Sequence, residues 1–141
     1  MRTIRLLILE DDLETVSILL KKLVKLENEL EEGENPKTFS TVVLSEYSMV
    51  EGYINRGSHE FDIVLLDRDD KVGGSFHALD FSKIDPSKII SISSIPDYNE
   101  EAKNSGVAVA IWKDYDNLEE FADQVVGEVK KIALTLLAKQ A

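Results

Sequence analysis

Acidic side chains follow two apolar runs that lie far apart in the sequence. The run at 4–9 is followed by three acidic residues, and the run at 61–66 is followed by Asp67. Apolar runs of this length predict buried parallel strands, and an open α/β sheet binds ligands at the carboxyl ends of its strands. We therefore expect one shallow pocket of mutually repelling carboxylates that favours a hard cation such as Mg²⁺. The first three acidic residues are Glu10, Asp11 and Asp12.

The bulk composition limits the classes of partner. The 141 residues are enough for one domain with a core, 1–141, and the net charge of −11 argues against nucleic acid or an anionic membrane as a direct partner. No apolar stretch is long enough to span a bilayer, and the N-terminus lacks a signal-peptide core. Without cysteine, disulfides are excluded, and we expect a cytoplasmic protein. His59 and His77 do not form a histidine-rich metal site.

The elements that must position these side chains alternate along the chain. Apolar residues recur at helical spacing from Leu13 up to Gly33, a helix-stopping residue. A loop is predicted from Asp69 to Ser75. Five strands are predicted, over residues 4–9, 38–44, 61–67, 88–93 and 107–112. The helices that follow the later strands are predicted over residues 45–56, 76–81, 96–104 and 116–139.

This order predicts a (βα)5 protein of the α/β class. Alternation of buried strands with helices gives a doubly wound parallel sheet that is covered on both faces. Asp116 and Glu119 predict a capping box at the start of an extended C-terminal helix. We expect one domain without a linker or an internal repeat.

The polar residues at the strand ends form a recognisable set. In chain order they resemble those of the receiver domain of two-component response regulators, and the resemblance covers essentially the whole chain. It implies a flavodoxin-like five-stranded sheet of order 2-1-3-4-5. The residues that carry the resemblance are Glu10, Asp11, Asp67, Ser93 and Lys113.

The resemblance implies a role for each of these residues. Asp67 is the expected phosphoacceptor, Lys113 the cation beside it, and Ser93 the hydroxyl donor to a phosphoryl oxygen. Asp12 either faces solvent or caps the helix that follows it. The implied Mg²⁺ ligands are Glu10, Asp11, Asp67 and the backbone carbonyl of Asp69.

Several positions depart from the receiver pattern. Asp70 and Lys71 stand where receivers commonly have Met-Pro, and Asp114 stands where a proline usually follows the lysine. Ala110 replaces the aromatic residue three positions before the lysine. The phosphorylation chemistry is therefore intact, whereas the route from Ser93 to an aromatic switch residue is in doubt.

Three functions compete on these observations. The first is a stand-alone receiver that is phosphorylated on Asp67 by a sensor histidine kinase or phosphotransfer protein, acts on a downstream protein, and is not an enzyme. The second is a pseudo-receiver that binds partners without phosphorylation. The third is a haloacid-dehalogenase-like phosphatase, suggested by the Asp-x-Asp pair Asp67 and Asp69. That pair normally closes the first strand of the phosphatase fold, which disfavours the third function.

The last predicted helix is longer than the strands beneath it. About 22 helical residues span roughly 33 Å, whereas a six-residue strand spans roughly 20 Å. We therefore expect Ile132, Leu136 and Leu137 to overhang the sheet. They would then either fold over the first helix or, as we favour, mediate a homodimer or partner contact.

Overall fold

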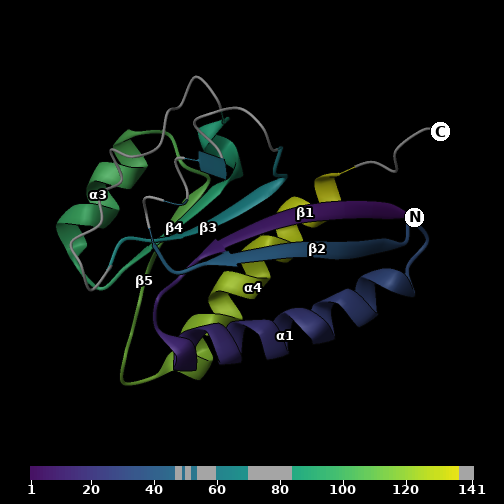
Figure 1. The fold of residues 1–141 in the computed structure, drawn as a ribbon, viewed down its shortest axis with the longest axis horizontal. Helices are drawn as coiled ribbons and strands as arrows, with labels where there is room; N and C mark the ends of the chain where they lie inside the picture. Colours follow the sequence, from purple (N-terminus) through teal and green to yellow (C-terminus); the bar gives the residue numbers. More distant parts are fainter. Residues whose placement is uncertain (47–48, 50–51, 54–59, 70–83, 137–141) are drawn as a thin grey trace.

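The computed structural model describes residues 1–46, 49, 52–53, 60–69 and 84–136. Its five strands form one parallel sheet in the order β2-β1-β3-β4-β5 (Figure 1), which confirms the predicted class and strand order. Strand β1 lies between β2 and β3, so the order of the strands reverses at β1, and open α/β sheets bind ligands at such a point. The strands are β1 (Arg2–Leu9), β2 (Lys37–Leu44), β3 (Ile63–Asp67), β4 (Ile89–Ser93) and β5 (Val109–Trp112).

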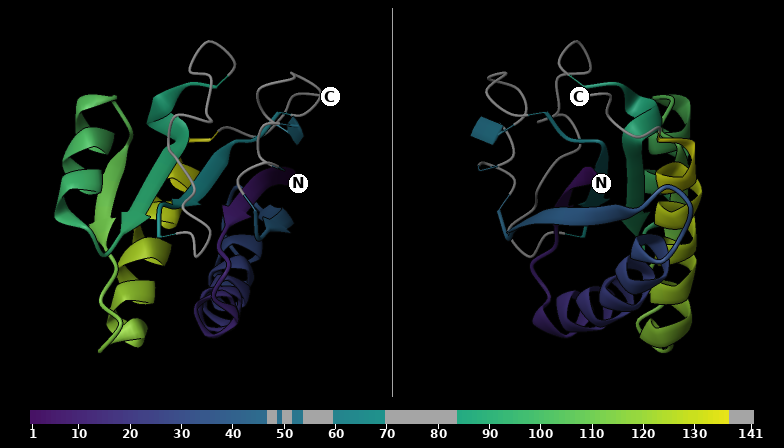
Figure 2. Two further views of the ribbon diagram at one scale, coloured as in Figure 1. Left: turned by 60° about the vertical axis from the view of Figure 1, so that its left-hand side comes forward. Right: turned by 90° about the vertical axis from the view of Figure 1, so that its right-hand side faces the viewer.

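Each sheet face is covered, because the central strands are apolar on both sides. Alternate residues of β1 point in opposite directions: Ile4, Leu6 and Ile8 belong to one core cluster, and Leu7 and Leu9 to the other. Helices α1 (Leu13–Glu31) and α4 (Leu118–Thr135) pack on the first face and contact each other (Figure 2). Helix α3 (Pro96–Asn104) packs on the second face beside β4 and β5.

Helix boundaries follow from local capping. Asp12 is the N-cap of α1 and accepts a hydrogen bond from the Thr15 N–H, so its capping alternative is confirmed. The predicted capping box at the start of the last helix is wrong by one residue. Asn117 is the cap there, and its side chain accepts from the Glu120 N–H at 3.2 Å.

The predicted strands agree with the structure to within two residues at each end. A short 3₁₀ turn, η3 (Pro86–Lys88), precedes β4 and takes the first residue of that predicted strand. The predicted helices over 45–56 and 76–81, the 69–75 loop, Asp70, Lys71, Leu137 and both histidines lie wholly or mostly outside the described residues. Among the residues described, no helix combines the length and apolarity needed to cross a membrane.

The C-terminal end of α4 differs from the sequence prediction. The helix ends at Thr135, four residues before the predicted end, and Leu136 has extended backbone. Ile132 and Leu136 do not overhang: both are partly buried and pack against the core cluster that α1 shares. The expectation of an uncovered apolar stripe was wrong because α1, at 19 residues, is about as long as the 18-residue α4 and packs alongside it.

Candidate functional site

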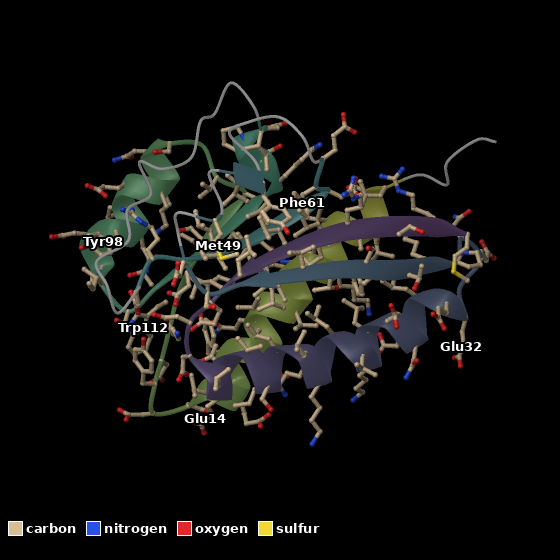
Figure 3. The ribbon with its side chains drawn as sticks, viewed as in Figure 1. Glu14, Glu32, Met49, Phe61, Tyr98 and Trp112 are labelled. Atoms are coloured by element: carbon tan, nitrogen blue, oxygen red, sulfur yellow. The ribbon has the colours of Figure 1, made fainter. Side chains whose placement is uncertain are left out.

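The sheet brings its functional side chains together at one end. Hydrogen bonds continue the ladder just beyond the strands: the Arg68 N–H donates to the Ile92 carbonyl at 2.8 Å, and the Lys113 N–H donates to the Ser93 carbonyl at 2.9 Å. These bonds fix the first residues of the loops relative to each other. In Figure 3, Trp112 lies at this end of the sheet and Glu32 at the opposite end.

Three carboxylates meet where β1 and β3 end. Oxygens of Glu10, Asp11 and Asp67 all lie within 4.8 Å of one another. Glu10 and Asp67 are only 3% exposed, whereas Asp11 is half-buried and opens the cluster to solvent. A set of carboxylate oxygens with one open side suits a hard divalent ion that retains some of its water, so these residues fit Mg²⁺.

Lys113 is the internal cation of the cluster. Its ammonium lies 2.8 Å from Glu10 Oε1 and 3.4 Å from Asp67 Oδ2, and the residue is only 1% exposed. Burial lowers the pKa of Lys113, but the charges of Asp67 and Glu10 outweigh burial and hold that pKa above its ordinary value. Lys113 is also among the largest fully buried side chains described, so it contributes to the core as well as to the site.

Burial raises the pKa of both buried carboxyls. Burial, followed by the hydrogen bond and charge of Asp67, raises the pKa of Glu10 to about 9. Burial also raises the pKa of Asp67, against the lowering effects of its hydrogen bond with Glu10 and of Lys113. One ammonium between two buried carboxyls balances only part of their charge, so the pair binds a proton more tightly than exposed carboxyls do. A divalent cation held by Glu10, Asp11 and Asp67 would compete with that proton.

Ser93 lies beside the cluster but is bonded to Asp69. The fully buried Ser93 hydroxyl donates to Asp69 Oδ1 at 2.6 Å and accepts from the Ile95 N–H at 2.9 Å. The Asp69 N–H in turn donates to Asp67 Oδ1 at 2.8 Å, so the 67–69 segment turns back on itself. The structure thus places Glu10, Asp11, Asp67 and Lys113 in direct proximity, and joins Ser93 to them through Asp69.

Sequence reasoning missed three side chains around the site. Only the backbone carbonyl of Asp69 was assigned a role, yet its carboxylate also accepts from the Tyr115 hydroxyl at 3.3 Å. The Lys113 ammonium lies 4.8 Å from the centre of the Tyr115 ring. Arg68 extends the other way, donating to the Tyr98 carbonyl and to Glu101 of α3, both at 3.1 Å.

One sequence feature could have marked Arg68 as a site residue: it is a cation that stands directly between Asp67 and Asp69. Its guanidinium stacks 4.5 Å from the centre of the Tyr98 ring, and its side chain is 4% exposed. Figure 3 labels Tyr98, which lies on α3. Arg68 therefore connects the residue after Asp67 to α3. Tyr115 had no comparable signal, because its contacts depend on the course of the chain after β5.

Comparison by sequence does not place the chain in a family. No family model matches it, and neither does any curated protein. Comparison of structures does give matches. The chain resembles the phosphorylated cyanobacterial phytochrome response regulator RcpA with a TM-score of 0.69 and 16% identity, over 98% of this chain and 99% of that one.

Two further structures of the same kind match nearly whole chain to whole chain. The Mn²⁺-bound form of the response regulator Rcp1 has a TM-score of 0.66 and 14% identity, covering 97% of this chain and 99% of that one. TrrA from Thermotoga maritima, in complex with Mg²⁺-BeF, has a TM-score of 0.56 and 17% identity, covering 92% and 98%. The chain therefore has the fold of response-regulator receiver domains.

Proposed function

We propose that this protein is a phosphoacceptor signalling domain that is phosphorylated on Asp67. The observation that carries the proposal is a buried carboxylate, at the end of a central strand, with an ammonium 3.4 Å away and two further carboxylates beside it. The receiver fold supports this proposal, since similar solved structures include a phosphorylated response regulator and one bound to Mg²⁺-BeF.

The reaction transfers a phosphoryl group to the Asp67 side chain. A carboxylate oxygen of Asp67 forms a bond to phosphorus while the bond from phosphorus to the donor, a phosphohistidine nitrogen or acetyl phosphate oxygen, breaks and the donor group leaves. Catalysis of such a transfer is mostly positioning and charge neutralisation. Lys113 supplies a positive charge that is already fixed in place by Glu10, so little reorganisation accompanies the transfer.

Glu10, Asp11 and Asp67 are the side chains that hold Mg²⁺ in this proposal, with the Asp69 carbonyl as a further ligand. The bound ion neutralises charge on the phosphoryl oxygens and on the carboxylates around them. Asp11 is the most exposed of the three side chains, which suits it to bind a partly hydrated ion.

The proposed partners are proteins. A sensor histidine kinase or a phosphotransfer protein supplies the phosphoryl group in the cytoplasm, and a downstream protein recognises the phosphorylated surface. On this proposal the chain catalyses at most its own phosphoryl transfer and dephosphorylation. The acidic composition, with a net charge of −11, supports protein targets over nucleic acid.

Intact mass spectrometry tests the proposal. The wild type is incubated with acetyl phosphate and Mg²⁺, and the same is done with Asp67→Asn and with Asp62→Asn as a matched control. Asp62 sits at the other end of β3, where it accepts from Arg2 and from the Arg5 N–H. We expect one phosphoryl adduct on the wild type and on Asp62→Asn. An equal yield on Asp67→Asn would contradict the assignment.

A pseudo-receiver is the second candidate, and one observation favours it. Ala110, at the position of the usual aromatic switch, is partly buried against the core cluster on the α3 face and has no ring to reorient. A domain of this kind binds its partner equally well in the presence and absence of a phosphodonor. A wild type that takes up no phosphoryl group in the experiment above would favour this candidate.

A further inference from the structure

Three hydrogen-bond donors converge on the carboxylate of Asp69. Its Oδ1 accepts from the Ser93 hydroxyl at 2.6 Å. Its Oδ2 accepts from the Ser94 N–H at 2.8 Å and from the Tyr115 hydroxyl at 3.3 Å. These donors come from the ends of β4 and β5, so one side chain after β3 ties three strand ends together.

Both oxygens of this carboxylate accept hydrogen bonds, one from Ser93 and the other from Ser94 and Tyr115. The Asp69 N–H also donates to Asp67 Oδ1, so the negative charge is two residues from the phosphoacceptor and held against it by a short turn.

The Ser93 hydroxyl cannot serve two acceptors at once. A serine hydroxyl has a single hydrogen to donate, and here that hydrogen is directed at Asp69. A phosphoryl group on Asp67 brings roughly two negative charges to the same place. The incoming group and Asp69 therefore repel each other and need the same donor.

We propose that Asp69 is an internal anion that restrains phosphoacceptance by occupying the donors that a phosphoryl group on Asp67 requires. This inference rests on the proposed function and adds its regulation. Phosphorylation then has two parts: formation of the phosphoaspartate, and displacement of the Asp69 carboxylate from Ser93, Ser94 and Tyr115. A partner that draws the Asp69 carboxylate away from these donors therefore makes Asp67 easier to phosphorylate.

Beryllofluoride titration with saturating Mg²⁺ tests the proposal without a phosphodonor enzyme. Trp112, the single tryptophan of the sequence, is 60% exposed and adjacent to Lys113, so its fluorescence reports binding. The variants are Asp69→Asn, which removes the charge, and Asp69→Ala, which removes the acceptor as well. Asp114→Asn is the matched control, because Asp114 lies at the same end of the sheet and contacts the Asp116 N–H instead.

We expect both Asp69 variants to bind beryllofluoride about tenfold more tightly than the wild type, the equivalent of one charge-assisted hydrogen bond. The control should match the wild type. Adding Ser93→Ala to Asp69→Asn should remove most of the gain, because the gain acts through that hydroxyl. Faster amide exchange at Ser94 in Asp69→Ala, with unchanged far-ultraviolet circular dichroism, establishes that the contact is lost and the fold kept.

The outcomes separate this proposal from the proposed function. Equal affinity of the wild type and both Asp69 variants overturns the internal anion and leaves phosphoacceptance standing. An equal gain in Asp114→Asn also overturns it, since the effect is then general charge reduction. Binding by the variants but not by the wild type supports both. Binding by none of them overturns the proposed function, and the restraint with it.

Discussion

Replacing Lys113 by methionine tests the electrostatic design of the site. Methionine nearly preserves the volume and the unbranched shape of lysine while removing its charge. The wild-type ammonium is 1% exposed and contacts two buried carboxyls at 2.8 Å and 3.4 Å. Breaking a buried pair from one side costs about 3–5 kcal/mol, because the remaining charge has no partner.

That cost is a large share of the free energy of unfolding of an ordinary domain, about 5–15 kcal/mol. At about 3 °C per kcal/mol for a domain of this size, the midpoint should fall by about 9–15 °C. The assay is urea and thermal unfolding at pH 8 in a chelating buffer. Adding millimolar Mg²⁺ should restore part of the loss, since the ion replaces the missing charge.

Lys22→Met serves as the comparison. Lys22 also contacts two carboxylates at 2.8 Å, those of Glu119 and Asp123, but on the surface. Its removal should change stability little, because surface ion pairs contribute little. A midpoint for Lys113→Met that equals the wild type in chelator would refute the reasoning, because it would mean that the buried carboxyls need no cation.

Three other outcomes follow from the structure. Millimolar Mg²⁺ should raise the thermal midpoint of the wild type by preferential binding to the folded state, and Asp11→Asn should abolish most of that rise in a thermal melt. The pKa of Glu10 is raised to about 9 from 4.5, so the folded protein holds a proton that the unfolded chain loses. The free energy of unfolding of the metal-free protein should therefore fall between pH 6 and pH 8.5, by at most about 1.4 kcal/mol per pH unit. Chemical denaturation of Glu10→Gln should show a flatter dependence of that free energy on pH. Ile132→Glu should destabilise the domain by about 2–4 kcal/mol in urea unfolding, because the Ile132 side chain packs on the core. Leu134→Glu, at a residue 61% exposed on the same helix, should not destabilise it. Equal effects of the two substitutions would support the expectation of a free apolar stripe.

The sheet could be predicted from the sequence because its central strands are buried on both faces. Such strands appear as unbroken apolar runs, and the first polar residue after each run marks the functional end of the sheet. Glu10, Asp67 and Lys113 were found in this way. The same logic placed Ser93 at a strand end, but not its hydrogen bond to Asp69.

The remaining features depend on geometry that local patterns do not encode. Asp116 and Asn117 are both good caps, and only the exit path from β5 selects the second. The burial of Lys113 depends on carboxylates that come from β1 and β3, far away in the sequence. The cover over Ile132 depends on the length and direction of α1, which periodicity alone does not relate to α4.

The contact between Glu10 and Lys113 joins residues 103 positions apart, which has a consequence during biosynthesis. At about 5–20 residues per second, roughly 5–20 s separate the synthesis of the two residues. Through that interval β1 and β2, neighbours in both chain and sheet, can already pair. The ammonium that balances the acidic residues arrives only with the end of β5. If translation stalls before this point, the acidic residues are present without Lys113. Cations from solution, and not the protein, must then balance their charge.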